Sequence, residues 1–97
     1  MSEKRYPEVI TPEILAELTH VSDDEIAQDI ADTEREISQY HAVGEAEARI
    51  ARAHPDQNER RMADFRARAR PEQIAQREAF VAYLRRLQVA RSQGVSA

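Results

Sequence analysis

The chain has 97 residues, of which 41% are hydrophobic and 33% charged, and a net charge of −4. This length allows one domain, and the composition is polar without being that of a disordered chain. The absence of cysteine excludes disulfides and thiolate-bound metals, and no apolar run approaches the roughly 18 residues of a membrane span. The N-terminus has no apolar segment of the signal-peptide type, so we expect a cytoplasmic protein without membrane contact. The Arg-rich composition suits a short bacterial or phage protein.

The first helix signal follows an extended arm. Residues 1–10 are predicted to be extended, since Pro7 blocks an early helix. Thr11 can cap the next segment, and Pro12 suits a first helical position. The sequence therefore predicts a short helix over residues 12–20.

The second helix start is the clearest local signal. Ser22 and Glu25 have the spacing of a capping box, which predicts a helix over residues 22–53. Along it an apolar or small residue recurs at alternating steps of four and three: Ile26, Ile30, Thr33, Ile37, Tyr40 and Gly44, continued after one extra step of four by Ala48 and Ala51. A period between 3.5 and 3.6 residues keeps one side of a helix facing a partner helix.

The third segment carries a proline. Asp56 and Glu59 have the spacing of a second capping box, and a helix is expected over residues 57–69. Because Pro71 removes a hydrogen bond and clashes with the preceding turn, we expect a kink, or a break followed by a further helix over residues 72–93. Gly94 is placed to end it, leaving a tail over residues 94–97.

These elements predict an all-α fold, in which a short N-terminal helix precedes a long antiparallel hairpin whose second arm is kinked or broken at Pro71. Residues 11–93 form the single domain. The expected turn places Ile37 opposite Ile74, and it places Gly44 and Ala48 on either side of Phe65. In the same register most charges pair: Glu45 with Arg66, Glu34 with Arg77, and Glu25 with Arg85 and Arg86.

The last segment is apolar around much of its circumference, more than one partner helix can cover. The residues predicted to contact another protein or a second copy are Phe80, Tyr83, Leu84 and Leu87, with Ile14 and Leu18 beside them. Aromatic anchors carry much of the energy of protein interfaces. The alternative is that these side chains form the ordinary core of a three-helix protein.

Catalytic chemistry has no signal in the sequence. There is no glycine-rich phosphate loop, and no spacing marks a nucleophile with its base, so we expect a protein that is not an enzyme. His41 and Glu45 are four residues apart, and Glu17 stands three residues before His20. A helical metal site needs such a pattern on several facing helices, so no metal and no cofactor are expected.

Charge is unevenly distributed. The basic stretch from Arg60 to Arg77 makes nucleic-acid binding the main alternative function, with Arg66, Arg68 and Arg70 as candidate contacts. The acidic second helix makes an inhibitor of a basic site a further alternative, with Asp29 and Asp32 on its face. Solvated helix faces would explain both stretches. The function we expect is a non-enzymatic protein–protein interaction module, self-associating as a homo-oligomer or docking on a larger protein.

Overall fold

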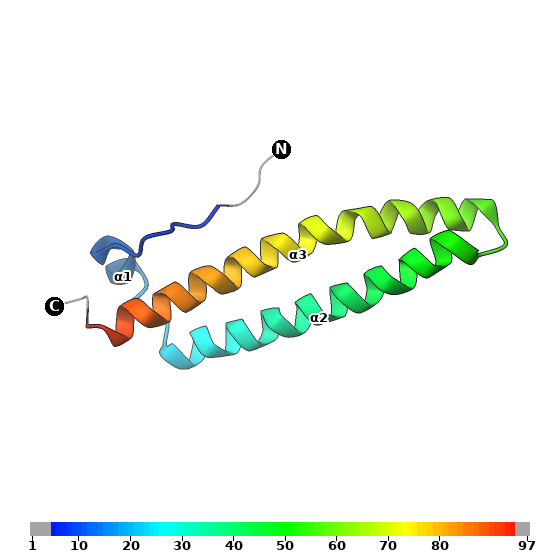
Figure 1. The fold of residues 1–97 in the computed structure, drawn as a ribbon. Helices are drawn as coiled ribbons and strands as arrows, with labels where there is room; N and C mark the ends of the chain where they lie inside the picture. Colours follow the sequence, from blue (N-terminus) through cyan, green and yellow to red (C-terminus); the bar gives the residue numbers. More distant parts are fainter. Residues whose placement is uncertain (1–4, 95–97) are drawn as a thin grey trace.

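Three helices account for most of the computed structural model, which describes residues 5–94; the predicted positions of residues 1–4 and 95–97 lie outside this range. They are α1 (Pro12–Glu17), α2 (Asp23–Ala53) and α3 (Gln57–Ser92). Helices α2 and α3 form a long antiparallel hairpin, while α1 and the N-terminal arm lie at its open end (Figure 1). The predicted all-α hairpin is thereby confirmed, and residues 5–94 contain no strand.

Side-chain caps set the helix starts. Thr11 accepts a hydrogen bond from the Ile14 N–H at 3.2 Å, and Ser22 and Glu25 exchange two bonds of 3.0 Å, as the capping box requires. Asp56 instead accepts from the Asn58 N–H at 2.8 Å, which is an ordinary N-cap bond, so the second predicted capping box does not form. At the far end Gly94 adopts a φ of +66°, a left-handed conformation that glycine accommodates without strain and that ends α3.

Pro71 does not break α3. The separate helices expected over residues 57–69 and 72–93 are one continuous helix. Proline still removes the hydrogen bond to the Ala67 carbonyl. Contacts with α2 hold the helix on both sides of this point, because Arg70 is bound to Glu47 and the side chain of Ile74 is buried.

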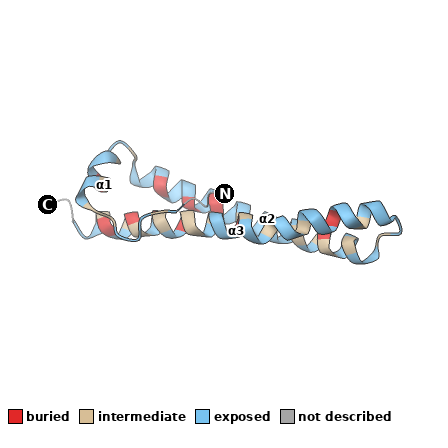
Figure 2. Cartoon of the chain, turned by 90° about the horizontal axis from the view of Figure 1, so that it is seen from above, coloured by how far each residue is buried: buried red, intermediate tan, exposed pale blue. Residues whose placement is uncertain are grey.

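The core occupies one half of the molecule. We call residues 5–36 and 77–94 the base half, and residues 37–76, which include the turn, the tip half. All members of the main buried cluster lie in the base half: Leu15, Ile26, Ile30, Val81, Leu84, Leu87 and Ala90. The tip half buries only Glu47, Ala63 and Ile74 among the described residues, and Figure 2 shows how sparse burial becomes toward the turn. The hairpin is therefore anchored at its base and thinly packed at its tip.

The molecule is elongated, with extents of 62 × 27 × 18 Å and a radius of gyration of 18.2 Å. A compact chain of this length has a radius of gyration of about 12.5 Å. The accessible surface is 7019 Å², against about 5,700 Å² for a compact monomer of 11.1 kDa. None of the helices in residues 5–94 combines the length and the apolar character that crossing a membrane requires.

The register between α2 and α3 differs from the predicted one by about three residues, less than one helical turn. A Cβ atom at Gly44 would lie 3.4 Å from Arg70 Cγ, so Gly44 packs against Arg70. Arg70 lies more than one helical turn beyond Phe65, the residue that the predicted register placed there. Phe65 is 71% exposed, and the prediction that it packs against Gly44 and Ala48 is wrong. The alternating spacing of four and three residues along α2 continues with a step of three from Gly44 to Glu47. Glu47 therefore occupies the position facing α3 that was predicted for Ala48.

Candidate functional site

The six predicted interface residues lie together in the base half, packed within the chain. Leu84 and Leu87 are buried, at 5% and 2% exposure. The half-buried side chains of Ile14, Leu18, Phe80 and Tyr83 pack against the same cluster. Within one chain these residues therefore have the contacts of the ordinary core that the sequence left as the alternative.

The N-terminal arm covers the aromatic part of this region. The Tyr6 ring stacks on Tyr83, with centroids 5.2 Å apart and a 25° angle between planes, and lies 5.6 Å from Phe80. Arg86 donates two hydrogen bonds to the Pro7 carbonyl, at 3.1 Å from Nε and 2.7 Å from Nη2. The guanidinium also lies 6.0 Å from the Tyr83 ring centroid. The arm thus takes up apolar surface of α3 that the sequence assigned to a partner.

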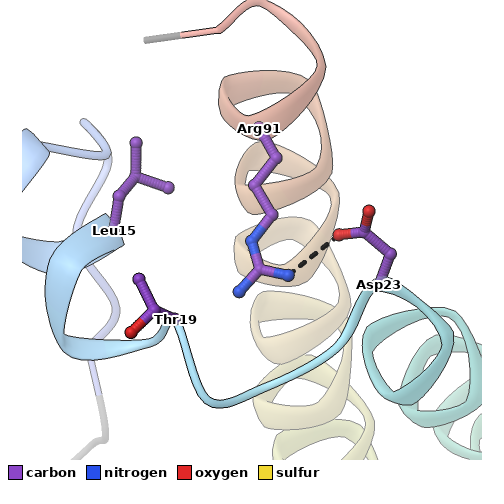
Figure 3. Close-up of a pocket in the computed structure, with 4 residues that line it drawn as sticks. All are labelled: Leu15, Thr19, Asp23 and Arg91. Carbon is purple, nitrogen blue, oxygen red and sulfur yellow. Dashed lines mark hydrogen bonds and ion pairs between the residues drawn. The ribbon is translucent and has the colours of Figure 1, made fainter. Parts of the chain in front are cut away.

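Arg91 fastens α1 to the hairpin. It donates from Nη1 to Asp23 Oδ1 at 2.8 Å and from Nη2 to the Leu18 carbonyl at 2.7 Å. Figure 3 shows the pocket at this point, with Leu15 and Thr19 on one side and the Arg91–Asp23 pair on the other. Both terminal nitrogens of Arg91 are thus engaged within the chain. The residues around this pocket hold α1 against the base of the hairpin.

Glu47 is the polar centre of the tip half, with 7% of its surface exposed. Arg70 binds it with two bonds, Nε–Oε1 at 3.0 Å and Nη2–Oε2 at 3.1 Å, and Arg66 Nε lies 3.3 Å from Oε2. The Arg70 hydrogen bond lowers the pKa of Glu47 below its ordinary 4.5, against the opposing effect of burial. An ionised carboxylate held by two guanidinium groups has no proton to exchange near neutral pH. Its role in this arrangement is to join α2 to α3.

The three candidate nucleic-acid contacts are used in intramolecular pairs. Arg66 and Arg70 bind Glu47, and Arg68 Nε lies 2.9 Å from Asp64 Oδ2. At the end of the same stretch Arg77 lies 3.1 Å from Glu36. Four of the six arginines in the basic stretch are therefore engaged with carboxylates of the hairpin, and Arg70, with a side chain 20% exposed, faces α2 rather than solvent.

The two candidate acidic residues are both exposed on α2. Asp32 accepts hydrogen bonds from Gln28 at 2.8 Å and from Arg35 at 3.0 Å. Asp29 has no ion pair among residues 5–94. No group of three or more His, Asp or Glu side chains in the described range lies close enough to hold a metal ion.

Four large apolar side chains near the turn remain exposed: Val43 at 43%, Ile50 at 38%, Met62 at 45% and Phe65 at 71%. We call them the tip patch. A helical residue is rotated by about 100° from the one before it, so Val43 and Ile50 lie on one side of Glu47, and Gly44 and Ala48 on the other.

The same construction on α3, taken from buried Ala63, places Met62 on the side of the hairpin that carries Val43 and Ile50. Phe65 lies about 160° from Ala63, so it points outward from α3, away from α2, at the edge of this side. Gly44, Ala48, Ala67 and Pro71 line a groove on the opposite side. The tip patch is thus contributed by both helices, with Val43, Ile50 and Met62 on one side of the hairpin and Phe65 at the outer edge of that side.

Sequence reasoning missed this patch. The available signals were the seven-residue spacing of Val43 and Ile50 and the three-residue spacing of Met62 and Phe65, each of which places two apolar residues on one helix face. Models of known protein families, curated proteins and solved structures were compared with the chain, and none of them matches it.

Proposed function

We propose that this chain is a non-enzymatic protein–protein interaction module that docks through its tip patch. The observation that carries the proposal is the grouping of Val43, Ile50 and Met62 on one side of the tip half, with Phe65 at its outer edge, each at least 38% exposed. Single exposed apolar residues are ordinary, whereas a grouped set on two adjoining helices is typical of an interaction surface.

The contrast between the two halves supports this proposal. In the base half the arm and α1 pack over the apolar side of α3, through Tyr6 and Leu15. In the tip half no other described segment packs over α2 and α3, because α1 and the arm lie at the opposite end (Figure 1). An apolar surface without an intramolecular cover gains free energy when a partner removes it from water.

Nucleic-acid binding, the main alternative, has less support. A phosphate backbone is held by arginines that are free to neutralise it. Arg66 and Arg70 share the carboxylate of Glu47, and Arg68 is paired with Asp64, so a phosphate would compete with these two carboxylates for the three candidate arginines.

Affinity capture from the native host tests the proposal. The bait is the whole chain, compared with the double variant Met62→Glu/Phe65→Glu, which adds charge at exposed helix positions and leaves the core intact. Val89→Glu is the matched control, since Val89 is also apolar, exposed (54%) and on α3, but lies in the base half. We expect a partner retained by wild type and the control and lost by the double variant. Equal retention by all three proteins would overturn the assignment of the patch.

A further inference from the structure

We infer that the occupant of the tip patch is a second copy of this chain, packed antiparallel so that two tip halves form a four-helix bundle. The inference rests on the proposed function and names its partner. In this arrangement α2 lies on α2 of the other copy, α3 lies on α3, and a two-fold axis passes beside Ala46, midway between Val43 and Ile50.

The length of uncovered hairpin fits this arrangement. From Ala46 to the turn at His54 is about eight residues, or roughly 12 Å of helix, so the overlap of two tips spans about 24 Å. The other copy's turn then reaches the level of Glu36 and Gln39. At this level the chain's own arm begins to cover the hairpin, since Tyr6, Glu36 and Phe80 line one pocket. The arm and the second copy would therefore cover consecutive lengths of the same hairpin.

The exposed area is sufficient for a dimer. The chain's 7019 Å² exceeds the surface of a compact monomer of its mass by about 1,300 Å². A standard interface takes about 800 Å² from each partner. The excess surface of each chain is therefore larger than the area that one partner contributes to a standard interface.

Charge favours the antiparallel orientation. Among described residues the base half has eleven carboxylates and six arginines, and the tip half six carboxylates and seven arginines. Arg49, Arg52 and Arg61 are exposed at the tip and have no ion pair within residues 5–94. An antiparallel dimer brings the basic tip of each copy next to the end of the other copy's acidic base half, at the level of Glu36. A parallel dimer would place acidic base beside acidic base, which complementary interfaces avoid.

Mass in solution is the first test. Light scattering or sedimentation equilibrium gives mass independently of shape, as this elongated chain requires. We expect twice the 11.1 kDa chain mass for wild type and Val89→Glu, and the single-chain mass for Met62→Glu/Phe65→Glu. A wild type that stays a single chain up to about 100 μM would overturn the inference. A dimer that the double variant leaves intact would also overturn it.

Cross-linking tests the orientation. Because the chain has no cysteine, each of two single variants, Ala46→Cys and Gln39→Cys, carries one reactive thiol. With a short bis-maleimide we expect Ala46→Cys to be joined to its own copy. Gln39→Cys should not be joined, since its two copies lie about 21 Å apart along the bundle. Coupling of both variants would indicate a parallel dimer and refute the proposed arrangement.

The failures of the two proposals can be told apart. If the chain is monomeric but captures a different protein that the double variant loses, the docking surface stands and the second copy is refuted. If the chain is monomeric and the double variant retains every captured protein, both proposals fail.

Discussion

Replacing Glu47 with alanine tests whether the tip half depends on a buried carboxylate. Removing one partner of a fully buried ion pair costs about 3–5 kcal/mol, because the remaining charge is left uncompensated. Here the side chain of Arg70 is 20% exposed and that of Arg66 is 44% exposed, so both guanidinium groups can partly return to water. We therefore expect the free energy of unfolding to fall by about 1–2 kcal/mol, which for a chain of this size is a Tm lower by about 4–16 °C.

Glu45→Ala is the matched control, since Glu45 is exposed, lies two residues away on the same helix and undergoes the same change of residue type. Urea unfolding of wild type and both variants, at one protein concentration, gives the three free energies. The pKa of Glu47 is lower in the folded chain than in the unfolded one, so its contribution is complete above pH 4.5 and is lost as pH falls through the folded value. Glu47→Ala should therefore differ most from wild type near pH 7 and least near pH 3. Equal effects of the two substitutions, or a difference independent of pH, would refute the reasoning.

Three further predictions follow from the packing. Tyr6→Ala should destabilise the chain by about 1 kcal/mol through the loss of two aromatic contacts, whereas Glu8→Ala in the same arm should have little effect. Thermal unfolding measures both variants, and equal Tm values would contradict the role of the arm. Pro71→Ala should raise the free energy of unfolding by about 1–3 kcal/mol, because it restores a hydrogen bond inside a continuous helix. Thermal unfolding measures the change, and a lower Tm would show that the proline stabilises the fold. Hydrogen exchange should be slower at the Leu84 amide than at Ile50, since the core lies in the base half; equal protection would argue against an anchored base and a thin tip.

Much of the fold was predictable because its signals are local. The caps at Thr11 and Ser22 depend on residues three positions away and are found as expected. The isoleucines at 26 and 30 are buried, as their spacing requires. Pro71 was harder, because the penalty of a proline inside a helix is local, while the contacts of Arg70 and Ile74 that outweigh it come from the other helix.

The register and the exposed patch were not predictable for a related reason. Hydrophobic periodicity assigns a glutamate to solvent. The side of α2 that faces α3 was therefore predicted to include Ala48, whereas in the structure it includes Glu47. The register itself was inferred from the position of the expected turn alone, and it placed Phe65 in the interface about three residues from where the structure has it. The paired arginines Arg66 and Arg70, one helical turn apart, were the signal that a carboxylate lies between the helices.

The contacts between the N-terminal segment and the last turns of α3 affect the order in which the protein can fold during synthesis. The bonds from Arg86 to Pro7 and from Arg91 to Leu18 join residues 79 and 73 positions apart. The arm and α1 leave the ribosome long before the last turns of α3 exist, whereas the hairpin can close progressively from its turn. Leu15, Ile26 and Ile30 therefore stay uncovered until the final third of α3 has been made, and the base half, which holds the main buried cluster, is the last to form.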